Sequence, residues 1–262
     1  MKSPTNSTRW LGGAATAVFL AFAGIPTTHA AVVTWGAAQQ ISNDSNVSTA
    51  GTLVGAVNLG DSSSSLATTV NGVAFQGLAV NIGSTSGSVA NFTVQTADPL
   101  GFTQFPNGTF GSASAPFAGL SASYRTLLNS ALTISNPSTF TLTMSGLTVG
   151  QAYQFEWFAN TSGPGNELHI ATAGNSSTLN DNTSGQEGGL GQFAVGSFVA
   201  DSTSQVITFS AGAGNFAQLN AFQLRAIPVP ESASLLFGLG IIPVIVAVEL
   251  RRKRRNSGTV PA

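Results

Sequence analysis

The sequence predicts an all-β domain built as an antiparallel two-sheet sandwich, and three observations lead to this fold class. Short apolar runs, several of them alternating with period two, follow one another between residues 31 and 226. Glycine, asparagine and serine separate these runs, as turn residues do. Only the segment 121–130 has helical periodicity, with Tyr124, Leu127 and Leu128 on one face. We expect a jelly-roll-like sandwich, with an immunoglobulin-like sandwich as the alternative.

About ten strands are expected at fairly regular spacing. The alternation is clearest where Tyr153, Phe155 and Trp157 share one side of a strand while polar residues fall mostly on the other. The expected strands cover residues 31–35, 53–59, 73–80, 89–94, 139–145, 152–159, 167–172, 192–200, 205–210 and 216–225.

The composition suits such a domain and excludes several kinds of chemistry. Charged residues make up only 7% of the 262 residues, and hydroxyl and amide side chains supply the polarity instead. Phenylalanine occurs 17 times, which is enough apolar volume to argue against disorder. Cysteine is absent, so disulfides, zinc–thiolate sites and cysteine nucleophiles are excluded.

Charge is distributed unevenly along the chain. Between residues 31 and 229 the only lysine or arginine residues are Arg125 and Arg225, against eight acids, so this part has a net charge of −6. Because it lacks a basic patch that could hold phosphates, nucleic-acid binding is excluded. The eight acids are Asp44, Asp61, Asp98, Glu156, Glu167, Asp181, Glu187 and Asp201.

Residues 1–30 have the three parts of a signal peptide. Lys2 and Arg9 precede an uncharged apolar stretch over 11–25, and Pro26 then leads to small residues before Ala30. We expect export by the Sec machinery and cleavage by signal peptidase after Ala30. The alternative is an uncleaved anchor helix, although the stretch is shorter than the roughly 20 residues that a span needs.

The C-terminal end has three further parts. Residues 227–232 are rich in proline, 233–250 form a predicted transmembrane helix, and 251–262 form a basic tail. Cations next to a span stay in the cytoplasm, so the sandwich is expected outside. The membrane-orienting residues are Arg251, Arg252, Lys253, Arg254 and Arg255.

This layout resembles the PEP-CTERM sorting signal of Gram-negative bacteria. The usual motif there is Val-Pro-Glu-Pro, and here it reads Val229, Pro230, Glu231, Ser232, with serine in place of the second proline. The resemblance implies an exosortase partner, an integral-membrane cysteine protease that removes the tail, and an association with biofilm and exopolysaccharide. It implies anchoring at the cell envelope and then release to the cell surface or extracellular matrix. An ordinary single-pass anchor is the alternative.

The sandwich itself has a second resemblance. Segments 142–153, 196–201 and 218–225 are similar to extracellular domains that precede PEP-CTERM tails, which look like galactose-binding or lectin-type jelly rolls. The phrase at 146–153 also occurs in fibronectin-like sandwiches. The match therefore supports a β-sandwich, without indicating a ligand, and residues 31–139 resemble no family that we can name.

Two carboxylates and one tryptophan are the candidate site residues. Glu156 and Glu167 are expected on adjacent strands, where they could form the acid pair of a glycosidase. Glu156 also lies next to Trp157, which resembles a sugar-stacking surface, so both are candidate ligand-binding residues. The alternative has Trp157 in the core and Glu156 solvated or paired with Arg225.

Other chemical sites are weaker. His169 is expected on the solvent face of its strand with Glu167, and no nucleophile elbow accompanies it. The segments 180–182 and 43–44 contain asparagine and aspartate that could bind calcium, but simple turns are the preferred interpretation. We therefore expect neither a metal nor a cofactor.

These observations lead to a non-enzymatic surface or matrix protein whose sandwich binds polysaccharide. The alternatives are a structural or adhesive matrix component without a defined ligand and, third, a glycan-acting enzyme.

Overall fold

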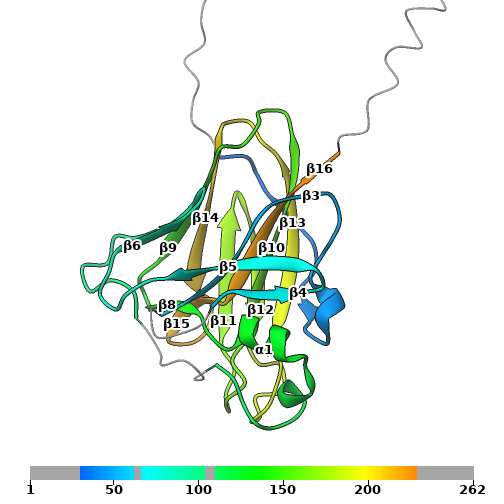
Figure 1. Cartoon of the computed structure of the whole chain (residues 1–262). Coiled ribbons are helices and arrows are strands. Elements are labelled where there is room, and N and C mark those ends of the chain that lie inside the picture. Colours follow the sequence, from blue (N-terminus) through cyan, green and yellow to red (C-terminus); the bar gives the residue numbers. More distant parts are fainter. Residues whose placement is uncertain (1–29, 62–65, 104–109, 229–262) are drawn as a thin grey trace, which may run out of the picture.

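The computed structural model describes residues 30–61, 66–103 and 110–228. In these ranges the chain folds into two β-sheets that pack face to face, with one short α-helix at the side (Figure 1). The predicted all-β sandwich is therefore confirmed.

The first sheet has eight strands in the order β1-β13-β10-β16-β3-β5-β4, with β2 paired to β13. Every pair is antiparallel except β3 with β5, which is parallel. The strands are β1 (Thr34–Trp35), β2 (Gln39–Gln40), β3 (Thr52–Gly60), β4 (Thr68–Val70), β5 (Val73–Ala79), β10 (Ala152–Ala159), β13 (Gln192–Val199) and β16 (Ala221–Ile227).

The second sheet has six antiparallel strands in the order β12-β11-β14-β9-β7-β6, and β15 pairs with β8 in a small separate sheet. The strands are β6 (Ser86–Val89), β7 (Phe92–Thr96), β8 (Leu132–Ser135), β9 (Phe140–Ser145), β11 (Leu168–Ala173), β12 (Asn175–Asn180), β14 (Ser204–Ala211) and β15 (Phe216–Leu219). The helical elements are η1 (Asp44–Asn46), η2 (Phe117–Gly119) and α1 (Ala122–Leu128).

The main core between the two sheets is aromatic. The rings of Trp157 and Phe209 meet edge to face with centroids 5.4 Å apart, and Phe209 stacks on Phe140 at 4.9 Å. Tyr153 and Phe155 belong to the same core, so the side of the 152–159 strand that they were expected to share with Trp157 faces inward. Aromatic rings bury large apolar areas, which accounts for the high phenylalanine content.

A second core covers the outer face of the first sheet. There the helix α1 buries Tyr124, Leu127 and Leu128, as its periodicity predicted. The helix begins after Ser121, whose hydroxyl accepts the backbone N–H of Tyr124 as an N-cap. The Tyr124 ring packs edge to face on Phe158 of β10, with centroids 6.3 Å apart.

Two predicted strands are divided in the structure. The segment expected as one strand over 89–94 is a hairpin, β6 and β7, whose turn at Ala90 has a φ of 48°. No glycine or proline marks this turn, which is why the prediction was wrong. The segment 216–225 is divided at Asn220 into β15 and β16, while β2, β4, β8 and β12 were not predicted.

Both described ends of the chain, Ala30 and Pro228, lie at the same end of the sandwich (Figure 1). Within the described ranges, no helix has the length and apolar character that crossing a bilayer requires. The predicted transmembrane helix 233–250 and all of the signal peptide before Ala30 lie outside the described residues.

Candidate functional site

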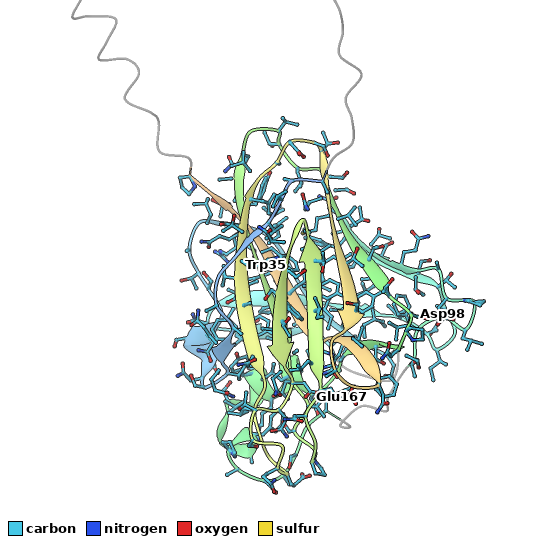
Figure 2. The ribbon with its side chains drawn as sticks, turned by 180° about the vertical axis from the view of Figure 1, so that it is seen from behind. Trp35, Asp98 and Glu167 are labelled. Atoms are coloured by element: carbon cyan, nitrogen blue, oxygen red, sulfur yellow. The ribbon has the colours of Figure 1, made fainter. Side chains whose placement is uncertain are left out.

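A pocket of roughly 280 Å³ opens at the second sheet's side of the sandwich, toward the end remote from Ala30 and Pro228. Glu167, which lines it, is labelled in Figure 2. The pocket is built by segments that are distant in sequence, and its lining residues are Phe110, Thr161, Pro164, Gly165, Asn166, Glu167, Asp181, Phe216 and Gln218.

Glu167 and Asp181 are joined by two hydrogen bonds. The Glu167 N–H donates to Asp181 Oδ1 at 2.8 Å, and the Asp181 N–H donates to the Glu167 carbonyl oxygen at 3.1 Å. These bonds extend the β11–β12 ladder by one step beyond Leu168. The side chain of Glu167 therefore starts from a fixed backbone position.

His169 lies beneath this part of the pocket and not on the solvent face. It is 1% exposed, with Nδ1 3.1 Å from the Phe216 carbonyl oxygen and Nε2 3.3 Å from Asp181 Oδ2. The expected exposed position is thus wrong. Its strand alternates as expected, but Leu168 and Ile170 take the outer side and the histidine turns inward with Ala171.

The contacts of His169 fix the orientation of its ring. A carbonyl oxygen only accepts, so Nδ1 carries a proton. Nε2 lies 3.3 Å from Asp181 Oδ2, without a hydrogen bond between the two atoms. The imidazole ring is thus placed between the Phe216 backbone and the Asp181 carboxyl group.

The carboxylate of Glu167 is only lightly bound by the protein. Oε1 accepts from Asn215 Nδ2 and Oε2 accepts from the Phe216 N–H, both at 3.3 Å from neutral donors. Gly214 leaves room for it, because a Cβ there would lie 2.7 Å from Glu167 Cγ and Cδ. A half-buried carboxylate with spare acceptor capacity thus lines the pocket.

Buried amides hold the other pocket residues in place. Asn160 Nδ2 donates to the Phe110 carbonyl oxygen at 3.2 Å, and Gln218 Nε2 donates to the Asn160 carbonyl oxygen at 2.8 Å. Thr161 in turn donates its hydroxyl to Gln218 Oε1 at 3.2 Å. Asn220 joins the network by accepting from the Asn160 N–H and from Gln218. Because these groups are buried and paired, the pocket is rigid at this side.

The two residues expected to bind a ligand are instead buried. Trp157 is fully enclosed in the main core and Glu156 is 2% exposed on the opposite face of β10. The interpretation of these two residues as a sugar-stacking surface is therefore wrong, because neither offers a surface to a ligand in this structure. The alternative that has Trp157 in the core is the one that fits.

Glu156 belongs to a chain of polar contacts that fastens a loop to the sheet. Its Oε2 accepts from the Ser48 N–H at 3.1 Å and from the side-chain amide of Gln223. Gln223 accepts from Arg225 at 3.1 Å, so the amide joins the two charged groups. Arg225 also donates to the carbonyl oxygens of residues 49–51. We call residues 48–51 the strap.

Burial raises the pKa of Glu156 to about 7 from an ordinary value of 4.5. The hydrogen bonds from Gln223 and Ser48 and the charge of Arg225 act in the opposite direction, yet they do not offset the loss of solvation. One carboxyl oxygen, Oε1, is buried without a hydrogen-bond partner, which agrees with a strongly desolvated acid.

The acid pair expected for a glycosidase is not formed. Glu156 lies on β10 of the first sheet and points to its outer face, whereas Glu167 precedes β11 of the second sheet. The two strands are not adjacent, because the chain crosses between sheets after β10. The prediction that placed these acids on adjacent strands is therefore wrong.

The asparagine and aspartate segments form turns, which was the preferred interpretation. Asn182 Oδ1 accepts from Ser184 and Gly185, and Asn43 Oδ1 accepts from the Ser45 N–H. Asp44 accepts from the Ser121 hydroxyl at 2.7 Å. Throughout the described part of the chain, no group of three or more histidine, cysteine, aspartate or glutamate residues is arranged to hold a metal.

The predicted sorting motif Val229, Pro230, Glu231, Ser232 and the basic residues 251–255 lie outside the described residues. Comparison of the chain with protein families, with curated proteins and with solved structures gives no match. The pocket was not predicted, although Glu167 and the segment 180–182 were singled out, because its lining residues become neighbours only in the folded sandwich.

Proposed function

We propose that the chain is an exported cell-surface or matrix protein that carries a PEP-CTERM-like sorting tail and binds polysaccharide in the pocket lined by Glu167. The observation that carries the proposal is the position of this pocket. It lies toward the end of the sandwich opposite to Ala30 and Pro228, so a tail that continues from Pro228 to the membrane would leave the pocket facing away from the cell.

The strand order supports a jelly roll rather than an immunoglobulin-like sandwich. The first sheet contains the neighbours β13-β10-β16-β3 and the second contains β12-β11-β14-β9. Along the chain these eight strands change sheet at every step except from β11 to β12. This interleaving is typical of two Greek keys, whereas an immunoglobulin-like sandwich keeps more consecutive strands in one sheet. Lectin domains are among the jelly rolls.

The chemistry of the pocket also favours a sugar. Its polar lining residues include Thr161, Asn166 and Glu167, and Phe216 is an aromatic one. Sugars present hydroxyl groups at the ring edge and C–H groups on the ring faces, and such a mixed lining complements both. The domain is held together without disulfides, so reducing conditions would not affect this binding.

Retention on a panel of immobilised polysaccharides tests the binding. We expect one class to be retained and Asn166→Ala, an exposed lining residue, to weaken retention about threefold to tenfold. Gln76→Ala is the matched control, because Gln76 is exposed on β5 in the first sheet. Uniform indifference to all classes would favour a structural or adhesive role without a defined ligand.

The mass of the intact protein from the host envelope tests the sorting. Removal of both ends by signal peptidase and an exosortase predicts a polypeptide that starts at Ala31 and ends near Glu231. A mass that still includes residues 251–262 would indicate an ordinary membrane anchor and would contradict the proposed sorting route.

A further inference from the structure

The pocket contains the carboxylate of Glu167, which has no cation beside it among the described residues. Asp181 also lines the pocket, but one of its oxygens lies 3.3 Å from His169 Nε2 and the other accepts from the Glu167 N–H. In the part of the chain that the structure describes, the donors to the Glu167 carboxylate are neutral, namely Asn215 Nδ2 and the Phe216 N–H. Among the described residues no arginine or lysine lines the pocket, so the lining does not offset the negative charge of the Glu167 carboxylate.

The two arginines of the described residues are used elsewhere. Arg125 donates to the Ala118 carbonyl oxygen at 3.1 Å, next to its own helix. Arg225 donates to the strap on the outer face of the first sheet. Neither can approach Glu167, and the acids between residues 31 and 229 outnumber the arginines by six. The field at the pocket is thus negative.

We infer that the pocket selects sugars that carry a protonated amino group, as in glucosamine units of a partly de-N-acetylated polysaccharide. This inference rests on the proposed polysaccharide binding. An ammonium group has three donors and no acceptor, and so it matches a carboxylate whose oxygens keep free acceptor positions. A neutral sugar would cover the Glu167 charge without compensating it, which reduces the affinity.

The geometry also disfavours acidic sugars. A uronic-acid carboxylate in the pocket would face Glu167 without any cation between them, and like charges at such distances repel. The charge pattern therefore predicts that the pocket does not bind acidic polysaccharides, which are common surface polymers.

Calorimetry with two hexasaccharides of equal length tests the inference, one of glucosamine and one of N-acetylglucosamine, at about pH 6 and low salt. We expect the glucosamine hexamer to bind about tenfold more tightly, with an advantage that shrinks as salt is added. Glu167→Gln keeps an oxygen that can accept from Asn215 and Phe216, and it should remove the difference between the two sugars. Asp201→Asn is the matched control, because this exposed acid lies in the turn after β13, at the other end of the sandwich.

Each outcome has a distinct meaning. Equal binding of both hexamers by the unmodified protein would overturn the amino-sugar inference and leave the proposed polysaccharide binding intact. Tight binding of a uronic-acid polymer would also overturn it. Hexalysine that binds as tightly as the glucosamine hexamer would show a general cation site and not a sugar site. Failure of every sugar to bind would remove the proposed function as well. A thermal melt of Glu167→Gln should match that of the unmodified protein. Such a match shows that a loss of binding is not caused by unfolding of the variant.

Discussion

Replacing Glu156 by glutamine should change how the stability of the domain depends on pH. The folded-state pKa of Glu156 is raised to about 7, while the unfolded chain has the ordinary value of 4.5. Between these values the folded state holds a proton that the unfolded state has released. Stability linked to Glu156 is therefore fully present below about pH 4.5 and is lost as the pH rises through 7.

The size of this loss follows from the pKa shift. A rise from 4.5 to about 7 corresponds to about 3 kcal/mol of unfolding free energy, at about 1.4 kcal/mol for each pKa unit. Glutamine is neutral at every pH and keeps an oxygen that can accept from Ser48 and Gln223. The variant should match the unmodified protein near pH 4.5 and exceed its stability by up to about 3 kcal/mol near pH 8.

Urea unfolding measured by circular dichroism from pH 4.5 to 8 provides the assay. The difference in unfolding free energy between Glu156→Gln and the unmodified protein should grow steadily over this range. Asp201→Asn removes an exposed carboxyl and should leave the slope with pH almost unchanged. If Glu156→Gln kept the slope of the unmodified protein, the carboxyl would not be desolvated as described, and the reasoning would be refuted.

Three other predictions concern the core, the amide network and the buried histidine. Trp157→Ala should lower the unfolding free energy by about 3–5 kcal/mol, against less than about 0.5 kcal/mol for the 57%-exposed Val199→Ala, as measured by chemical denaturation. Asn220→Ala should lower the unfolding free energy by about 3 kcal/mol in the same assay, because the buried carbonyl oxygens of Leu128 and Ser130 would lose their donor. A near-neutral change would mean that water replaces the amide. In nitrogen NMR spectra the Nδ1 of His169 should carry a proton, because it faces the Phe216 carbonyl oxygen; an unprotonated Nδ1 would contradict this contact.

Local patterns predicted the elements whose own residues decide their environment. Tyr153, Phe155 and Trp157 are large and apolar at every second position, so their common side of β10 was predictable, although the burial of Trp157 was not the first interpretation. The helix was likewise predictable, because Ser121 caps it and its apolar residues recur at helical spacing. These features depend on residues that are close in sequence.

Features that depend on distant segments were not predictable. Glu156 reads as a solvent-facing residue because the strap that covers it lies more than a hundred residues earlier in the chain. His169 reads as exposed because Leu168 and Ile170 are the larger apolar residues beside it. In the structure Ala171 and Ala173 belong to the main core, so the smaller side of the strand, which carries His169, turns inward. The pocket has the same origin, since its lining residues meet only after folding.

The position of β16 has a consequence for the timing of folding. This strand is the last one described, yet it lies inside the first sheet between β10 and β3. Until residues 221–227 emerge, β3 lacks its antiparallel neighbour, and the strap lacks Arg225, which binds it across a separation of about 175 residues. Closing such distant contacts is slow and requires nearly the whole domain. In a chain that emerges from its N-terminus first, the first sheet therefore stays in two separate parts until β16 is available. This single strand then joins β10 to β3.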